Sequence, residues 1–412
     1  MGADLYSSPA KRGRWRDADT HRDGGGVQTS TTAQPDAPSV RYATTSPVAP
    51  RSTGEDISRR AILASTGALA LAACSPKDAQ SQSNVGQSAP ADLPPLKSVA
   101  PFRIGTCVQA LHLDDPVLAP LIAREANQLT PEWQMKMEYI VQPDGSFRFD
   151  APDRIAAFAR AHGMGLLGHT LIWYAQVPEA FQRLDESRIG FADAYRNYIL
   201  AVAGRYAGQV VGWDVVNEAV AEDGNGWRDS LWSQRLGDFE HIALAYRTAR
   251  EADPHAPLLL NDYNLEYNPR KRATFLKLAE RMLASGTPLN GLGTQMHVAA
   301  DIAPGEITRM IRELASLGLP IHVSELDVSL VRADNKLLSR ADLQRRQTAV
   351  YAEAAEAFMA LPQAQRFAFT LWGLRDRDSW LKGENATDAP AAFDDSGRPK
   401  APAAALVQAF RA

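Results

Sequence analysis

From residue 98 to the C-terminus, short apolar runs of strand length alternate with amphipathic stretches of helical period. Short apolar runs of strand length occur at Arg103–Val108, Gly165–Thr170, Val210–Asn217, Leu258–Asp262, Gly291–His297, Ile321–Leu326 and Ala368–Trp372, with a weaker run at Gln128–Thr130. Helical periodicity appears between them at Asp153–Ala161, Phe191–Tyr206, Asp238–Ala252, Arg272–Ala284 and Glu306–Leu317. Glycine or proline follows closely after these helical stretches, which is typical of helix ends.

Alternating apolar strands and amphipathic helices predict a parallel sheet that is covered on its faces. Eight strand–helix units over about 310 residues fit a (β/α)8 TIM barrel of the α/β class. A doubly wound open sheet is the alternative, but neither GxGxxG nor GxxxxGK is present to support it. We therefore predict one barrel domain over residues 98–412.

The segment before the barrel predicts export. Residues 1–57 are polar and lack an apolar period, which indicates disorder or a misassigned translation start. Residues 58–73 begin Ser-Arg-Arg and continue as an alanine-rich apolar run, a pattern typical of a twin-arginine signal. The run ends Leu-Ala-Ala-Cys, which resembles a lipobox, so Cys74 is a predicted lipidation site; the alternative is a chance alanine-rich helix before an ordinary cleavage site. Residues 74–97 would then form a polar tether.

This pattern predicts a periplasmic or cell-envelope protein, with lipid on Cys74 as its one membrane attachment.

The composition excludes several classes of protein. The chain is 45% hydrophobic, so it can bury a core, and its net charge of −4 argues against nucleic-acid binding. Two cysteines exclude a disulfide framework, and nothing indicates a cofactor. We expect a monomer without a cofactor.

Polar residues gather at the predicted C-terminal strand ends, where barrel enzymes carry their chemistry. Glu218 directly follows the predicted strand Val210–Asn217, and Glu325 lies near the end of the predicted strand Ile321–Leu326. Two carboxyl groups facing each other across the barrel mouth suit glycoside hydrolysis, which needs one of them protonated and the other ionised. A helix cap or surface ion pair is the simpler interpretation of any single acid. The recurrence of polar groups at corresponding positions argues against it here.

Strand alternation places Asp327 on the same side as Glu325, and His297 on the same side as Gln295. An Asp–His–Glu set of this kind would keep one carboxylate ionised, whereas an apolar mouth would raise the pKa of Glu218. Metal binding by His297 and nearby acids is disfavoured, because neither HExxH nor a calcium-loop pattern is present. A serine hydrolase is disfavoured by the absence of GxSxG.

The tryptophans divide by position. Trp213 and Trp232 are predicted to pack in the core. Trp173, Trp372 and Trp380 lie at strand ends or in following loops, so they are predicted to contact substrate, because sugar rings stack on aromatic faces.

Several motifs occur in one order along the chain: LTPEWQMK (129–136), GHTLIW (168–173), WDVVNEA (213–219), NDYN (261–264), SELDV (324–328) and a closing FDDSGRPKAPA. Together they resemble glycoside hydrolase family 10, the retaining endo-β-1,4-xylanases, from about residue 99 to the C-terminus. The resemblance implies hydrolysis of internal β-1,4 bonds in xylan or xylo-oligosaccharides, through a covalent glycosyl–enzyme intermediate.

The resemblance also implies a role for each matching residue. Glu218 would be the general acid/base and Glu325 the nucleophile, with His297 and Asp327 tuning it. Asn217 would bind the 2-hydroxyl of the sugar that is cleaved. The residues implied to line the sugar subsites are Glu132, Lys136, His169, Trp173, Gln176, Gln295, Trp372 and Trp380.

Two positions depart from the family pattern. Trp133 stands where the family usually has an asparagine that binds the sugar two units from the cut, and Tyr174-Ala175 replaces His-Ser. An indole cannot repeat the hydrogen bonding of asparagine, but it could stack on a sugar, narrow the groove or point into the core. A related β-1,4-glycanase or oligosaccharide hydrolase is therefore a second hypothesis, and a non-catalytic sugar-binding protein is a third.

Overall fold

The computed structural model describes residues 92–184, 188–333 and 337–412. The predicted export signal, Cys74 and most of the predicted tether lie outside these ranges. Within them, no helix is both long and apolar enough to cross a membrane.

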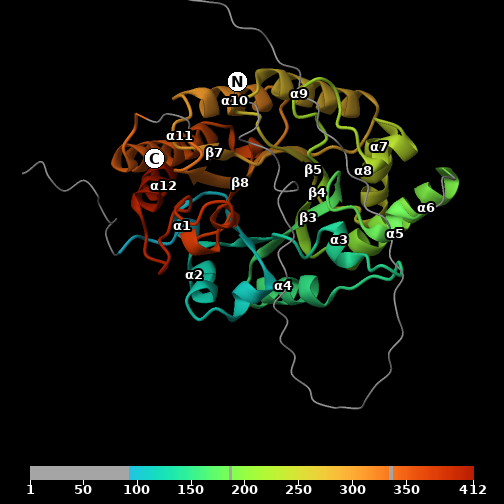
Figure 1. Ribbon diagram of the computed structural model, residues 1–412, viewed down its shortest axis with the longest axis horizontal. Coiled ribbons are helices and arrows are strands. Elements are labelled where there is room, and N and C mark those ends of the chain that lie inside the picture. Colours follow the sequence, from blue (N-terminus) through green and yellow to red (C-terminus); the bar gives the residue numbers. More distant parts are fainter. Residues whose placement is uncertain (1–91, 185–187, 334–336) are drawn as a thin grey trace, which may run out of the picture. The chain divides into compact units, whose positions relative to one another are not determined.

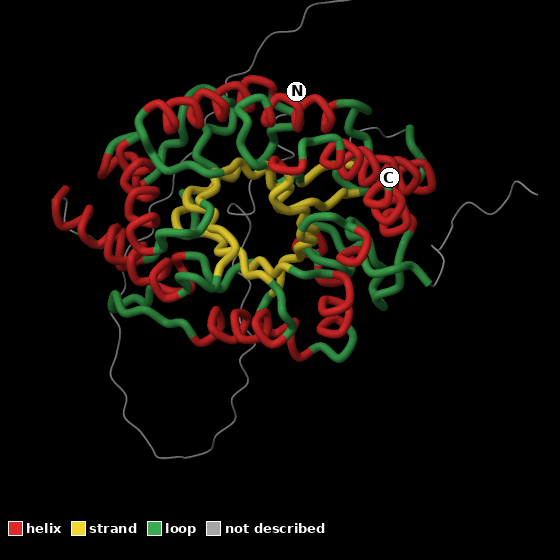
Figure 2. The backbone as a smooth tube through the Cα atoms, turned by 180° about the vertical axis from the view of Figure 1, so that it is seen from behind, coloured by secondary structure: helices red, strands yellow, loops and turns green. Residues whose placement is uncertain are grey.

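Eight parallel strands close into a barrel, which Figure 2 shows as the inner ring. They are β1 (Arg103–Val108), β2 (Gln128–Pro131), β3 (Gly165–Trp173), β4 (Val210–Asn217), β5 (Leu258–Asp262), β6 (Gly291–Thr294), β8 (Ile321–Ser329) and β9 (Arg366–Leu371). Neighbours in this order pair with each other, and β9 pairs with β1 to close the ring. The short strand β7 (His297–Ala299) extends the sheet by pairing with the far end of β8. The predicted (β/α)8 barrel is confirmed.

Helices surround the strands on the outside (Figures 1 and 2). They are α1 (Leu96–Val99), α2 (Leu118–Glu125), α3 (Met137–Ile140), α4 (Asp150–Ala161), α5 (Glu179–Gln182), α6 (Arg188–Arg205), α7 (Leu231–Leu236), α8 (Glu240–Ala252), α9 (Pro269–Ala284), α10 (Glu306–Ala315), α11 (Arg340–Met359) and α12 (Ala401–Arg411), with 3-10 turns η2 (Ala110–Asp114), η3 (Gln363–Gln365), η4 (Asp376–Asp378) and η5 (Trp380–Gly383). The starts are chemically defined: Asn268 caps α9 ahead of Pro269, and Ser339 caps α11.

The structure corrects one predicted strand. Residues 291–297 do not form a continuous strand, because Met296 adopts a left-handed backbone with φ of 60° and interrupts the extended chain. β6 therefore ends before this residue and β7 begins after it. Among the helices of eight or more residues, α2, α11 and α12 were not predicted.

The core confirms the predicted roles of Trp213 and Trp232, which are 0% and 1% exposed within the main hydrophobic cluster. Trp213 of β4 lies directly against Gly168 of β3. A Cβ atom at Gly168 would lie 2.0 Å from Cε3 of the indole, so only glycine leaves room for the ring. Cys107 of β1 is also buried and free.

The seam between β1 and β9 joins the beginning and the end of the barrel. Gly105 is paired with Thr370 across it. Phe102, just before β1, packs edge-on against Phe358 of α11 and Phe410 of α12, with ring centroids 4.9 and 5.2 Å away. The last two helices therefore cover the seam.

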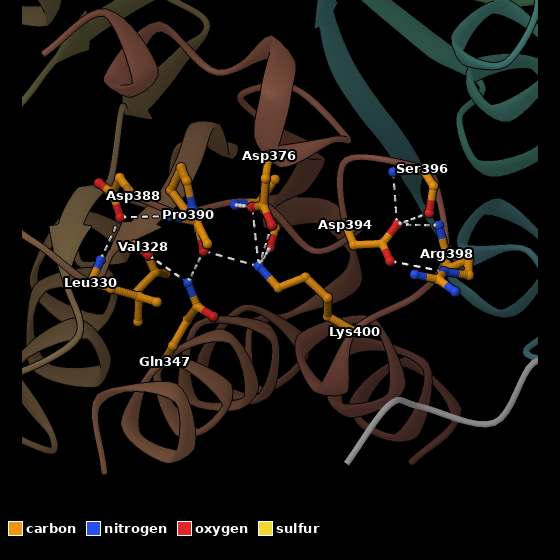
Figure 3. A network of polar contacts seen from close by, with 12 residues as sticks. Val328, Leu330, Gln347, Asp376, Asp388, Pro390, Asp394, Ser396, Arg398 and Lys400 are labelled. Carbon is orange, nitrogen blue, oxygen red and sulfur yellow. Dashed lines mark hydrogen bonds and ion pairs between the residues drawn. The ribbon is translucent and has the colours of Figure 1, made fainter. Parts of the chain in front are cut away.

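A buried polar network fixes the long loop between β9 and α12 (Figure 3). Lys400 donates to both carboxylate oxygens of Asp376 at 3.0 Å, and to the carbonyl oxygens of Ala389 and Ala391 at 2.9 and 2.8 Å. One ammonium group thus serves four acceptors and ties the start of the loop to its end.

The same network ties this loop to the end of β8. Asp388 accepts hydrogen bonds from the Ser329 hydroxyl and the Leu330 amide, at 2.6 and 2.9 Å. Gln347 of α11 donates to the carbonyl oxygens of Val328 and Ala389 at 2.8 and 2.7 Å. The loop that carries Trp380 is therefore held against the strand that carries Glu325 and Asp327.

Candidate active site

Glu218 is fixed at the end of β4 by its own backbone. Its φ of 61° is a left-handed conformation that costs a non-glycine residue about 1–3 kcal/mol. Two hydrogen bonds hold it: its amide donates to the Asn261 carbonyl at 2.7 Å, and Arg228 Nε donates to the Glu218 carbonyl at 2.8 Å. The residue is 1% exposed, so its carboxyl group has a defined place at the barrel mouth.

A chain of side-chain amides connects the two glutamates. Asn261 Nδ2 donates to Glu325 Oε1 at 2.8 Å and to Asn217 Oδ1 at 3.0 Å. Gln295 Nε2 lies 3.0 Å from Glu218 Oε1 and 3.3 Å from Asn217 Oδ1. The predicted strand-end residues of β4 and β8 therefore meet in one network, together with Gln295 from the break between β6 and β7.

Glu325 is kept ionised by His297, which Asp327 in turn keeps protonated. His297 Nε2 lies 3.3 Å from Glu325 Oε2, and its Nδ1 lies 3.0 Å from Asp327 Oδ2. Burial alone would lower the pKa of His297, but these two carboxylates outweigh it and raise the pKa to about 10. Burial alone would raise the pKa of Glu325, but the hydrogen bond from His297 and nearby positive charges leave it below its usual value. The predicted Asp–His–Glu set is present.

The pKa of Glu218 moves in the opposite direction. Burial raises it, although the charge of Arg228 and the hydrogen bond from Gln295 partly oppose the rise. Within the described chain, Glu218 Oε2 is buried without a hydrogen-bond partner. One carboxyl group is thus biased towards the acid form and the other towards the carboxylate. General-acid and nucleophilic roles require this division.

Glu132 and Lys136 lie together beyond the end of β2. Both are buried, at 3% and 7% exposure. Glu132 accepts a hydrogen bond from Gln109 at 3.0 Å, and Lys136 Nζ lies 4.6 Å from the centre of the Trp173 ring. Burial raises the pKa of Glu132 and lowers that of Lys136.

Aromatic and histidine side chains line the mouth between β3 and β9. His169 Nδ1 lies 2.9 Å from Asp214 Oδ2, which orients its ring. Trp372 packs edge-on against His169 and His297, with centroids 5.6 and 6.0 Å away. Trp380 Nε1 donates to Asp327 Oδ2 at 2.8 Å. These contacts bring Trp372 and Trp380 to the Glu325 side of the site.

Gln176, just beyond β3, has a left-handed φ of 51°, and its buried Oε1 has no partner within the described residues. An unpaired buried acceptor of this kind is available to a ligand. Among the described residues, no group of three His, Cys, Asp or Glu side chains could hold a metal ion.

Sequence reasoning assigned no role to three residues at this site: Asn261, Arg228 and Asp214. Asn261 and Asp214 stand out only as polar residues in apolar strands, whereas their partners lie on neighbouring strands. Arg228 lies in the loop after β4, where no periodicity marks it. Its guanidinium group also lies over the ring of Tyr174, 4.2 Å from the centre, and donates to the Tyr263 hydroxyl at 3.1 Å.

The chain is similar to known proteins over its barrel domain. The model of "Glycosyl hydrolase family 10" matches residues 96–409. Endo-1,4-beta-xylanase A of Cellvibrio japonicus is 34% identical over 347 residues, which cover 76% of this chain and 56% of that protein. The Geobacillus stearothermophilus endo-1,4-beta-xylanase is 34% identical over 311 residues, covering 73% of this chain and 93% of the relative.

A relative with a different name and a solved structure also match this chain. Exoglucanase XynX of Acetivibrio thermocellus is 36% identical over 318 residues, covering 74% of this chain and 28% of that protein. The chain thus spans about half or less of the length of some relatives it matches. The solved structure of a GH10 endoxylanase from a sugarcane soil metagenome aligns with a TM-score of 0.70 at 32% identity, covering 77% of this chain and all of that one.

Proposed function

The chain belongs to glycosyl hydrolase family 10, and from this premise we propose that it is an endo-1,4-β-xylanase. It cleaves internal β-1,4-xylosidic bonds of xylan with retention of anomeric configuration. The opposite pKa shifts of two buried carboxyl groups joined through one amide network carry this proposal.

The proposed reaction has two steps. Glu325 attacks the anomeric carbon while Glu218 gives its proton to the departing glycosidic oxygen, so that a glycosyl ester forms as the chain breaks. Glu218, now a carboxylate, then takes a proton from water as the water oxygen attacks the same carbon and releases Glu325. The protonated His297 stabilises the carboxylate of Glu325 before attack and after release.

Binding of the sugar is assigned to the polar groups around this pair. Asn217 is oriented by Asn261 and Gln295, so its remaining hydrogen-bonding capacity can face the 2-hydroxyl of the cleaved sugar. The other proposed sugar-binding residues are Glu132, Lys136, His169, Trp173, Gln176, Trp372 and Trp380.

Variants of the two glutamates test the roles. On xylan, whose leaving group is poor, Glu218→Ala should lose about 10²–10⁴-fold in rate. With an activated aryl xylobioside the aryl group still departs, and added azide should resolve the intermediate to the β-azide. Glu325→Ala should lose retaining hydrolysis, and azide should then give the α-azide by direct displacement. Exchange of these two products between the variants would reverse the assignment. An α-anomer as the first product of the wild-type protein would refute retention.

A second candidate function is hydrolysis of β-1,4-glucans, because a relative at 36% identity is named an exoglucanase. Release of reducing sugar from xylan, cellulose, mixed-linkage glucan and xylo-oligosaccharides ranks these substrates. Preference for a glucan would replace the xylanase proposal. Binding without release from any substrate would favour a sugar-binding protein.

We also propose export through residues 58–73 and lipidation of Cys74, supported by the Arg-Arg pair and the Leu-Ala-Ala-Cys sequence. Two or three acyl chains would give stable membrane residence. The protein should then fractionate with membranes and be released by detergent but not by salt, and Cys74→Ala should abolish the association. A Cys74→Ala protein that stays on membranes would refute lipid anchoring, and a freely released wild type would do the same.

A further inference from the structure

Trp133 lies in the turn between β2 and α3, outside the main hydrophobic cluster of the described residues. It is half-buried between Glu132 and Lys136, which are both buried at the barrel mouth. The hydrophobic side chains that form or pack against the core cluster in the described chain include neither Trp133 nor Tyr139. This contrasts with Trp213 and Trp232, which the cluster encloses.

An aromatic neighbour orients the ring of Trp133. It stacks on Tyr139, with ring centroids 6.1 Å apart and an angle of 25° between the planes. The Lys136 amide donates to the Trp133 carbonyl at 2.8 Å, which closes a tight turn, and Gln109 holds Glu132 on the other side. The indole is therefore anchored before any ligand arrives.

We propose that Trp133 and Tyr139 form an aromatic platform that binds a pyranose ring of the substrate, one or two units beyond the sugar that is cleaved. This inference rests on the proposed function. The platform is continuous with Glu132 and Lys136 and lies at the end of β2. Arg228, which contacts Tyr174 and Tyr263, instead donates to the backbone carbonyl of Glu218.

The chemistry of the platform defines what it recognises. An indole face contacts the C–H surface of a sugar ring and discriminates little between orientations of individual hydroxyl groups. Its one N–H can donate a single hydrogen bond and cannot accept one. We therefore expect this subsite to contribute affinity for a β-1,4-linked ring through contact area, in a length-dependent manner.

Aryl β-glycosides of one, two and three xylose units test the platform, because the aryl group occupies the leaving-group side and each added sugar extends the other side. In the wild type, kcat/KM should rise with the second or third unit. Trp133→Ala should reduce one of these increments by about tenfold, the effect of about 1.4 kcal/mol of stacking. Its kcat/KM on the one-unit substrate should stay within about twofold.

Two further variants complete the test. Trp133→Phe should keep most of the increment, since it retains an aromatic face. Phe158→Ala is the matched control: Phe158 of α4 is also half-buried and stacks on His162 at 4.0 Å and 26°, but on an outer helix. It should leave every increment unchanged.

The outcomes separate the two proposals. A wild-type protein that cleaves none of the glycosides and no xylan overturns the proposed function. An active wild type whose increments are unchanged in Trp133→Ala overturns the platform alone. Equal loss on all three substrates also overturns it, because the substitution would then act on the catalytic centre. Thermal melting of Trp133→Phe and Trp133→Ala identifies any misfolded variant. If Trp133→Ala is misfolded, Trp133→Leu, which keeps an apolar side chain but removes the aromatic face, decides the question: weaker binding of xylotetraose than in the wild type supports the platform, and equal binding overturns it.

Discussion

Replacement of Lys400 by methionine is the sharpest test of how the β9–α12 loop is held. Methionine keeps most of the apolar length of the side chain but removes the ammonium group. Asp376, only 5% exposed, would then lose two charged hydrogen bonds, and the carbonyls of Ala389 and Ala391 would lose their shared donor.

The expected loss of unfolding free energy follows from the carboxylate of Asp376, which is left without its charged partner. Removal of one partner of a buried ion pair costs about 3–5 kcal/mol, and the lower value applies here because the Lys400 side chain is 20% exposed. Unfolding of roughly 320 residues releases about 0.7 kcal/mol/K of entropy. A loss of about 3 kcal/mol should therefore lower Tm by about 5 °C.

The loss should depend on pH in a defined direction. Burial raises the pKa of Asp376 to about 6, above its value of about 3.9 in an unfolded chain. The folded state thus binds this proton more tightly, so its contribution to stability is complete below pH 4 and is lost as pH rises through 6. Lys400→Met raises this pKa further. The loss of unfolding free energy caused by Lys400→Met should therefore be larger at pH 8, where the unpaired carboxyl group of Asp376 tends to ionise, than at pH 5.

Urea and thermal unfolding of Lys400→Met, Asp376→Asn and the double variant measure the coupling as a double-mutant cycle. The double variant should lose at least about 1 kcal/mol less than the sum of the single variants. A Lys400→Met penalty below about 1 kcal/mol, or one that is larger at pH 5 than at pH 8, would refute the reasoning.

Three further predictions follow from other contacts. Gly168→Ala should lower the free energy of unfolding by about 3 kcal/mol, because the new Cβ would collide with a buried indole. Gly204→Ala in α6 has open space around the new Cβ, so it should raise the free energy of unfolding by about 0.5–1 kcal/mol. Equal effects of the two substitutions in urea melts would contradict this prediction. His297→Asn should raise the pKa of Glu325 and move the acidic limb of kcat/KM to higher pH, and an unmoved limb would contradict that role. Arg228→Gln should raise the pKa of the acid/base glutamate and move the basic limb upward; a downward shift would be evidence against it.

The barrel strands were predictable because burial on both faces gives continuous apolar runs. β1, β4 and β5 have the predicted bounds for this reason. α11 was not predicted, because its buried positions include Gln347 and three alanines and its polar and apolar residues separate weakly around the helix. The kink at Met296 was also missed, since nothing in the local sequence marks a left-handed methionine.

At the site, the position of a residue along its strand could be predicted from the sequence. Its partners on neighbouring strands could not. Glu218 and Glu325 were identifiable as strand-end acids, and the structure brings them into one network. The part played by Asn261 depends on β5 lying beside β4, where Asn261 is paired with Asn217. The Asp376–Lys400 pair lies 24 residues apart in an irregular loop, so no periodicity connects the two.

The seam between β1 and β9 has a consequence for the order of folding. Gly105 pairs with Thr370, 265 residues later in the chain (370 − 105). At a synthesis rate of about 5–20 residues per second, the first strand waits roughly 13–53 s for its second partner. During that interval one edge of β1 has unpaired backbone groups, and such an edge readily pairs with other chains. A chain cut before β9 would keep this open edge permanently, so loss of the last strand should cause aggregation rather than merely a less stable barrel.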